Sequence, residues 1–117
     1  MKNTVSIRFN NQFKYLYLNG STQRSNCLVM HYLRNNKKYN KLGITVSSKL
    51  GGAVIRNRIR RLVQEAYRLN EINISFGYNI VIVARNFALN NKFQKISQDL
   101  VYMLKKAGLY VKKNVDR

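Results

Sequence analysis

The feature that most constrains this chain is the stretch at residues 47–69, whose second half repeats apolar side chains at helical spacing. An α-helix turns by about 100° per residue, so these side chains fall on one arc that can pack on a core. The arc consists of Ile55, Ile59, Leu62, Val63, Ala66 and Leu69. The opposite side carries five arginines, Arg56, Arg58, Arg60, Arg61 and Arg68. The sequence therefore predicts an amphipathic helix whose outer face is mostly guanidinium.

A charged outer stripe is common to surface helices, but such stripes usually mix signs and pair Glu with Lys four residues apart. Here only Glu65 faces the five arginines, and its simplest role is to hold Arg61 and Arg68 in place. A guanidinium binds phosphate oxygens through two parallel hydrogen bonds and stacks on bases. The helix therefore favours a nucleic-acid partner over a merely solvated face.

The charge of the whole chain agrees with this interpretation. Its 117 residues include 22 Lys plus Arg against 4 Asp plus Glu, for a formal net charge of +18. A compact body with this charge repels itself, and a polyanion that releases its counterions on binding relieves the repulsion. Because 45% of the residues are hydrophobic, we expect a folded chain, with a single domain over residues 1–117 and a basic tail at 109–117.

Several classes of protein are disfavoured by what the sequence contains. No apolar run approaches the ~20 residues of a spanning helix, and the N-terminus lacks the apolar region of a signal peptide, so we expect a cytoplasmic protein that binds no membrane. One cysteine, Cys27, excludes an internal disulfide and a multi-cysteine metal site. The acids Glu65, Glu71, Asp99 and Asp116 form no evident pair for acid–base chemistry or metal binding. We therefore expect no catalytic residue, metal or cofactor in the chain itself.

The remaining elements follow from turn signals and periodicity. We predict a helix at residues 10–19 that Gly20 ends in the left-handed conformation, and a last helix at 91–107 that Gly108 ends. Strands are predicted at 27–33, 41–47 and 78–84, with a further short strand possible within 21–26. The segment 34–40 is predicted to be a hairpin loop joining the first two, and the apolar strand 78–84 is expected to be covered on both faces. The order strand, helix, strand implies a βαβ crossover in a mixed sheet, hence an α+β sandwich.

Three ring-bearing residues are candidates for binding bases. Phe13 and Tyr17 share a face of the first helix, and they could pack in the core or form one wall of an aromatic groove for unstacked bases. The spacing alone favours the core. His31, the only histidine, cannot build a metal site or a catalytic triad alone, so a plain strand residue is the first interpretation and base stacking the second. Lys49 precedes Gly51 and Gly52, which excludes a P-loop and leaves a basic crossover loop beside the arginines.

Residues 43–68 resemble the signature of the bacterial ribonuclease P protein subunit, which has a strand, a Lys-containing loop and an Arg-Asn-Arg helix, here Arg56-Asn57-Arg58. The similarity extends to the spacing of Phe13 and Gly20, to the strand ending at Arg85 and to the closing amphipathic helix. It implies a small basic protein that assembles with a large catalytic RNA and helps to remove the 5′ leader from precursor tRNA. The RNA would carry the active site and most of the magnesium ions, and no protein partner would be required.

The resemblance also implies a fold and a set of contacts. The fold would be a sandwich of helices on a mixed sheet of three or four strands, with a left-handed βαβ crossover like that of a ribosomal small-subunit protein domain. The residues expected to face the catalytic RNA are Lys49, Arg56, Asn57, Arg58, Arg60, Arg61 and Arg68. The residues expected to line a groove for the single-stranded leader are Phe13, Tyr17 and His31.

Two positions depart from the family pattern. Ser48 stands where the family usually has a second lysine, and Gln64 stands where it often has a basic residue. Each change removes one candidate contact. The alternative is a general RNA-binding module of ribosomal-protein type with no role in cleavage. A DNA-binding protein with the arginine helix in a major groove is less favoured, because no helix-turn-helix or dimer zipper surrounds that helix.

Overall fold

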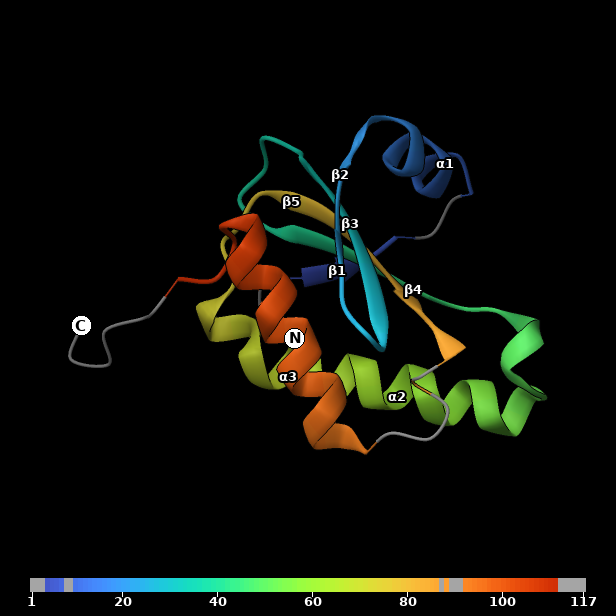
Figure 1. The fold of residues 1–117 in the computed structure, drawn as a ribbon. Helices are drawn as coiled ribbons and strands as arrows, with labels where there is room; N and C mark the ends of the chain where they lie inside the picture. Colours follow the sequence, from blue (N-terminus) through green and yellow to red (C-terminus); the bar gives the residue numbers. More distant parts are fainter. Residues whose placement is uncertain (1–3, 8–9, 87, 89–91, 112–117) are drawn as a thin grey trace.

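The computed structural model describes residues 4–7, 10–86, 88 and 92–111, and its elements form a mixed sheet with helices on both faces (Figure 1). The strands are β1 (Thr4–Ser6), β2 (Ser21–Arg24), β3 (Leu28–Arg34), β4 (Asn40–Val46) and β5 (Tyr78–Ala84). The α-helices are α1 (Asn10–Asn19), α2 (Ala53–Asn70) and α3 (Phe93–Ala107), and two short 3₁₀ helices are η1 (Ser48–Leu50) and η2 (Glu71–Asn73). The α+β prediction is confirmed, and so is the short strand within residues 21–26.

The sheet has five strands in the order β1-β4-β5-β3-β2, where three or four were expected. The strand that the sequence did not reveal is β1, whose three residues, Thr-Val-Ser, are too few to show an alternating pattern. It pairs in parallel with β4, with Thr4 opposite Asn40.

The predicted hairpin between β3 and β4 is wrong, because β5 lies between these two strands. Residues of β3 pair with β5 in antiparallel register, with Met30 opposite Ile82, while β4 pairs with β5 in parallel, with Ile44 opposite the same residue. The apolar β5 takes the central place, where it has a neighbour on each side. The hairpin is instead formed by β2 and β3, with Ser21 opposite Tyr32. The predicted βαβ crossover is confirmed as β4-α2-β5.

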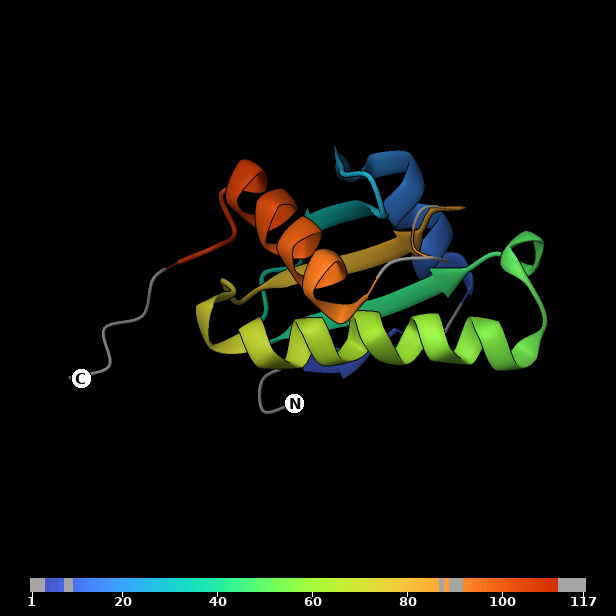
Figure 2. The same ribbon diagram turned by 60° about the horizontal axis from the view of Figure 1, so that its bottom comes forward.

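Both faces of β5 are covered, as predicted. Ile80 and Ile82 belong to the larger core beneath α2 and α3, whereas Val81 belongs to a smaller core with Leu16 of α1. Helix α1 therefore lies across the sheet from α2, and α2 packs against α3 (Figure 2). This arrangement leaves the outer face of α2 to solvent and places α1 beside the other face of the sheet.

The buried stripe of α2 differs from the predicted arc at both ends. Ile59, Val63 and Ala66 are fully buried, but Ile55 is 41% exposed and Leu69 is 54% exposed. These two residues lie in the first and last turns of the helix, which extend past the core. The side chain that the sequence did not place inside is Tyr67, whose buried hydroxyl contacts Thr4 Oγ1 at 3.0 Å and accepts from Asn40 Nδ2 at 3.2 Å.

Two glycines end helices for different reasons. Gly108 ends α3 as predicted, with φ 75° and an N–H that donates to the carbonyls of Leu104 and Lys105. Gly20 ends α1 without a left-handed φ, so that prediction is wrong. A Cβ at Gly20 would lie 2.7 Å from Leu16 O and 2.9 Å from Tyr32 O, so glycine is needed there for a close approach of backbones.

The C-terminal segment begins inside the core. Leu109 is 1% exposed, and Tyr110 forms an isolated antiparallel bridge with Ile74. Leu109 thus packs with the apolar residues of α3, and the basic tail over residues 109–117 stays a prediction. Residues 112–117 of the predicted tail lie outside the described residues, as do residues 89–91 near the predicted start of the last helix.

Candidate nucleic-acid interface

The outer face of α2 presents the predicted arginines, and short contacts within the helix orient them. Arg60 Nη1 donates to Asn57 Oδ1 at 2.8 Å, and Arg61 Nε donates to the Asn57 carbonyl at 3.3 Å. Arg68 forms an ion pair with Glu65, with Nε donating to Oε2 at 3.0 Å. Hydrogen bonding to the Arg68 guanidinium holds the pKa of the Glu65 carboxyl below its usual range. Glu65 thus holds Arg68 as expected, whereas Arg61 is held by the Asn57 carbonyl.

The arginine face is hollowed at its centre. Arg58, Arg61, Arg68 and the residues between them line a depression of about 530 Å³. Arg56 lies one turn before Arg60, and its Nε is buried with no hydrogen-bond partner within the described part of the chain. A buried donor without an acceptor is costly, so Arg56 is suited to an acceptor that arrives with a ligand.

Lys49 lies in η1, just before α2, and is exposed. The Ser47 hydroxyl accepts from the Lys49 backbone N–H at 3.2 Å and so caps this short turn. Gly51 follows with φ 146°, a conformation that side chains with a Cβ rarely adopt. The loop therefore places Lys49 at the same end of α2 as Arg56.

The other predicted site lies between α1 and the sheet. Tyr17 is 42% exposed, and its ring meets the His31 ring edge-on, with centroids 4.9 Å apart and planes at 76°. Thr22 Oγ1 lies 3.1 Å from His31 Nδ1. Burial, aided by the charge of Arg24, lowers the pKa of His31, so the ring is neutral at physiological pH. The structure therefore brings together two partly exposed rings that the sequence separates by 14 positions.

Phe13 occupies the inner part of the same region. Its ring packs in the smaller core and lies over Gly43, where a Cβ would come within 2.6 Å of the ring. Phe13 is thus half-buried in the core, which is the role that the spacing favoured, whereas Tyr17 is more exposed. Two residues of this region were not singled out from the sequence: Gly43, whose position inside a strand was a signal of close approach, and Arg24, which gave no local signal.

The described residues hold no group of three or more His, Cys, Asp and Glu side chains that could bind a metal ion. Of the described helices, none is both long enough and apolar enough to cross a bilayer.

A family model described as ribonuclease P matches residues 1–108. The chain belongs to the ribonuclease P protein family. It is 41% identical over 105 residues to the ribonuclease P protein component of Clostridium botulinum strain Langeland, an alignment that covers 89% of this chain and 95% of that protein. The Staphylococcus aureus RNase P protein structure has a TM-score of 0.82 at 30% identity, covering 90% of this chain and 96% of that one. The Thermotoga maritima RNase P protein has a TM-score of 0.80 at 28% identity, covering 86% and 96%.

Membership in the ribonuclease P protein family gives the chain its function. It is the protein component of a ribonucleoprotein endonuclease, with a role in the 5′ maturation of precursor tRNA and an implied association with ribonuclease P RNA and with that substrate. A module without a role in cleavage and a DNA-binding protein are therefore set aside.

Proposed function

We propose that this protein uses two separate surfaces in tRNA maturation. The arginine face, defined as Lys49, Arg56, Asn57, Arg58, Arg60, Arg61 and Arg68, binds the catalytic RNA. The aromatic groove, defined as Phe13, Tyr17 and His31, binds the single-stranded 5′ leader. The observation that carries the proposal is that the cations and the exposed rings lie on elements packed against opposite faces of the sheet.

The arginine face is suited to the phosphates of a structured RNA. Its guanidiniums are oriented by Asn57 and Glu65 before any ligand arrives, so less side-chain entropy is lost on binding. Each phosphate that it neutralises releases counterions from the RNA. Ser48 and Gln64 contribute no charge to this surface.

The aromatic groove is suited to unpaired bases. Stacking on an aromatic ring contributes about 1–3 kcal/mol per base and tolerates any sequence. His31 is held neutral, so it offers a ring face without a formal charge. Only a precursor tRNA has a leader to place there, so the groove distinguishes precursor from product.

The remaining parts of the proposal concern the assembly. The catalytic site and most of the magnesium ions are held by the RNA and the substrate, and the protein requires no protein partner. The chain acts in the cytoplasm, without a membrane, as one domain over residues 1–117. Its β4-α2-β5 crossover is left-handed, like that of the ribosomal small-subunit protein domain.

Reconstitution tests the proposal directly. Purified protein, its catalytic RNA and a labelled precursor tRNA are combined at low magnesium, and each component is omitted in turn. We expect cleavage at the 5′ end of the mature tRNA to require the protein or to be strongly stimulated by it. Binding of RNA with no change in cleavage would favour a general RNA-binding role.

Two variants test the surfaces separately. Arg60→Ala with Arg61→Ala should weaken binding to the catalytic RNA and reduce the slope of log K against log salt by up to about 0.9 per lost phosphate contact. Lys37→Ala with Lys38→Ala removes the same charge from the exposed β3-β4 loop and serves as the control. An equal loss of slope in both would remove Arg60 and Arg61 from the interface.

For the groove, Tyr17→Ala should weaken binding of precursor tRNA more than binding of mature tRNA. Tyr15→Ala removes an aromatic ring that is 60% exposed on the same helix, and it should leave the difference unchanged. Equal losses for precursor and mature tRNA in Tyr17→Ala would show that Tyr17 does not contact the leader.

A further inference from the structure

The depression on the arginine face contains side chains that phosphate binding does not use. Its volume is about 530 Å³, and all of the described residues that line it belong to α2. They are Arg58, Arg61, Leu62, Gln64, Glu65 and Arg68. Three of these are arginines, whereas the others supply an apolar side chain, an amide and a carboxylate. This mixture differs from a surface that binds phosphate alone.

Leu62 supplies the apolar part of the depression. It is partly buried, packs against the larger core and borders the depression. Arg61 lies beside it, and the Arg61 Nε donates to the Asn57 carbonyl at 3.3 Å, which orients the guanidinium plane. Guanidinium planes stack on nucleobases, and an apolar side chain gains from contact with a ring but not from contact with a phosphate. These two residues therefore favour a base.

The carboxylate of Glu65 points to the same conclusion. Arg68 Nε donates to Glu65 Oε2 at 3.0 Å, and Arg68 Nη2 donates to Oε1. Each oxygen has thus accepted one hydrogen bond and has capacity for another. Because the pKa of Glu65 lies below its usual range, the carboxyl is ionised at neutral pH. An ionised carboxylate repels a phosphate and attracts a hydrogen-bond donor.

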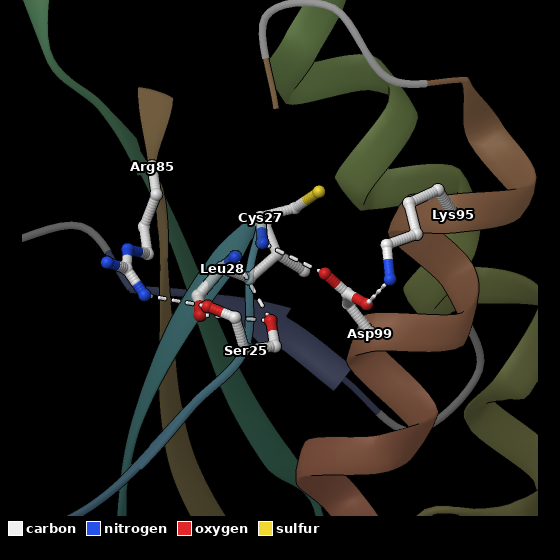
Figure 3. Close-up of polar contacts among 6 residues, drawn as sticks. All are labelled: Ser25, Cys27, Leu28, Arg85, Lys95 and Asp99. Carbon is white, nitrogen blue, oxygen red and sulfur yellow. Dashed lines mark hydrogen bonds and ion pairs between the residues drawn. The ribbon is translucent and has the colours of Figure 1, made fainter. Parts of the chain in front are cut away.

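The carboxylate in a second hollow is placed differently. This hollow, of about 560 Å³, lies at the β2 edge of the sheet, and its lining includes Arg24, Arg85, Asp99 and Tyr102. Asp99 is buried, with the Cys27 N–H donating to Oδ2 at 2.9 Å and Lys95 Nζ 3.0 Å from Oδ1 (Figure 3). Burial and these partners commit Asp99 to the fold. The Glu65 side chain is 47% exposed, so its oxygens are accessible to a ligand in the depression.

Gln64 determines which base fits best. Its side chain is exposed next to Glu65, and its amide has both a donor and an acceptor. In base recognition a glutamine amide pairs with N6 and N7 of adenine, which uses one of the two N6 hydrogens. The other hydrogen is left for Glu65, and adenine N1 can accept from a guanidinium. Guanine has a carbonyl in place of the N6 amino group, and uracil has one N–H between two carbonyls, so both would bring oxygen toward the carboxylate.

We propose that the depression binds one unstacked adenine of the catalytic RNA. Gln64 and Glu65 bind its amino group, and its ring packs on Leu62 and on the Arg61 guanidinium. The inference rests on the proposed binding of the catalytic RNA by the arginine face, and it adds one specific base to that contact. The adenine is unpaired, because side chains cannot reach the bases in the deep, narrow major groove of an RNA helix.

The direction of the effect of Glu65→Ala on binding of the catalytic RNA provides the first test. If the face bound only phosphates, removal of a negative charge would strengthen binding. We expect binding to weaken about threefold or more, because a hydrogen bond to a charged acceptor is lost while one repulsive charge is removed. Filter binding of the purified protein to its catalytic RNA measures the change.

Gln64→Ala tests recognition of the base without a change of charge. It should weaken binding of the catalytic RNA about fivefold or more, since a bidentate amide contact is lost. The slope of log K against log salt should stay unchanged, because no phosphate contact is removed. Gln98→Ala removes the same amide from an exposed position on α3 and should bind like the parent protein.

Methylation by dimethyl sulfate, which reacts with N1 of unpaired adenines, identifies the base. At saturating protein, one adenine that the parent protein protects should become reactive in Gln64→Ala and in Glu65→Ala. Replacement of this adenine by uracil should weaken binding of the parent protein. Gln64→Ala should then cause no further loss, because the two changes remove the same contact.

The outcomes separate this inference from the proposed role of the arginine face. If Arg60→Ala with Arg61→Ala reduces the salt slope but Gln64→Ala binds like the parent, or if Glu65→Ala binds more tightly, the depression holds no base and the phosphate role stands. If none of these variants affects binding, both proposals fail. Adenine protections that are the same in all variants would also overturn the inference. Circular dichroism should show Gln64→Ala and Glu65→Ala folded, since both substituted side chains are accessible to solvent.

Discussion

At the scale of single residues, Gly43 controls how deeply the Phe13 ring enters the sheet face. A Cβ at this position would lie 2.6 and 2.7 Å from two ring carbons of Phe13. We predict that Gly43→Ala displaces the ring, lowers the free energy of unfolding by about 1–3 kcal/mol and weakens binding of precursor tRNA. Urea unfolding and a binding titration measure the two effects.

Gly52→Ala provides the matched control for Gly43→Ala. A Cβ there meets nothing within 4 Å, and the residue has an extended φ of −73° at the start of α2. Because Gly52 is the N-cap of α2 and alanine is a poorer N-cap than glycine, its unfolding free energy should fall by about 0.5 kcal/mol, less than for Gly43→Ala. If the two alanine variants were equally stable, the Phe13 ring would have room to move without cost.

Asp99 makes the stability of the fold depend on pH. Burial alone would raise the pKa of its carboxyl, but hydrogen bonds from the Cys27 N–H and from Lys95 outweigh burial and lower it. Burial, with Asp99 next, also raises the pKa of the Cys27 thiol to about 11, so the thiol stays neutral and adds no competing charge. Asp99 therefore stabilises the fold at pH values above its unfolded-state pKa, and this contribution is lost as the pH falls through the lower folded-state pKa.

We predict that Asp99→Asn lowers the free energy of unfolding by about 2 kcal/mol at neutral pH, since it removes the charge from two hydrogen bonds. The difference from the parent protein should begin to shrink below about pH 4, near the unfolded-state pKa, and disappear as the pH falls through the lower folded-state pKa. Urea unfolding across this pH range measures it. Glu65→Gln removes the same charge from an exposed position and should change stability little. If the difference in unfolding free energy between Asp99→Asn and the parent protein did not vary with pH, the pKa of Asp99 would not be lowered in the folded state.

At the scale of elements, the phase of α2 determines both the core and the arginine face. Ile59 is fully buried, whereas Val54 on the same helix is 81% exposed. We predict that Ile59→Asp unfolds the protein, because a buried carboxylate without a partner costs several kcal/mol. Val54→Asp should leave it folded. Circular dichroism and thermal unfolding distinguish them, and a folded Ile59→Asp variant would show that the helix phase is wrong.

At the scale of the whole molecule, the net charge of +18 acts against folding. The radius of gyration is 13.6 Å, so most charges lie within one Debye length at 0.01 M salt, about 30 Å, but beyond it at 0.15 M, about 8 Å. We predict that the melting temperature rises with sodium chloride over this range. A variant with Lys37→Gln and Lys38→Gln should show a smaller rise, and a salt-independent melting temperature would contradict the prediction.

How much could be predicted from the sequence depended on whether the signal was local. The periodicity of α2 and α3, the apolar run of β5 and the Gly108 stop each lie within one segment, and each was predicted correctly. The neighbours of β5 were not predicted. The polar loop between β3 and β4 indicated that these two strands pair with each other, but each pairs with β5, which begins more than 30 residues later. The strand β1 pairs with β4 across 36 residues, and the buried Tyr67 hydroxyl contacts Thr4 across 63, so neither gives a local signal.

The sequence by itself determined the partner class, the amphipathic arginine helix and the family signature, because charge and helical period are properties of consecutive residues. Only the tertiary structure decided that Tyr17 meets His31, that Gly43 admits the Phe13 ring, and that Arg24, Arg85 and Tyr102 surround one hollow. These sites are assembled from separate strands and helices whose pairing is set by burial of β5 on both faces, and packing of that kind leaves no pattern in the order of the residues.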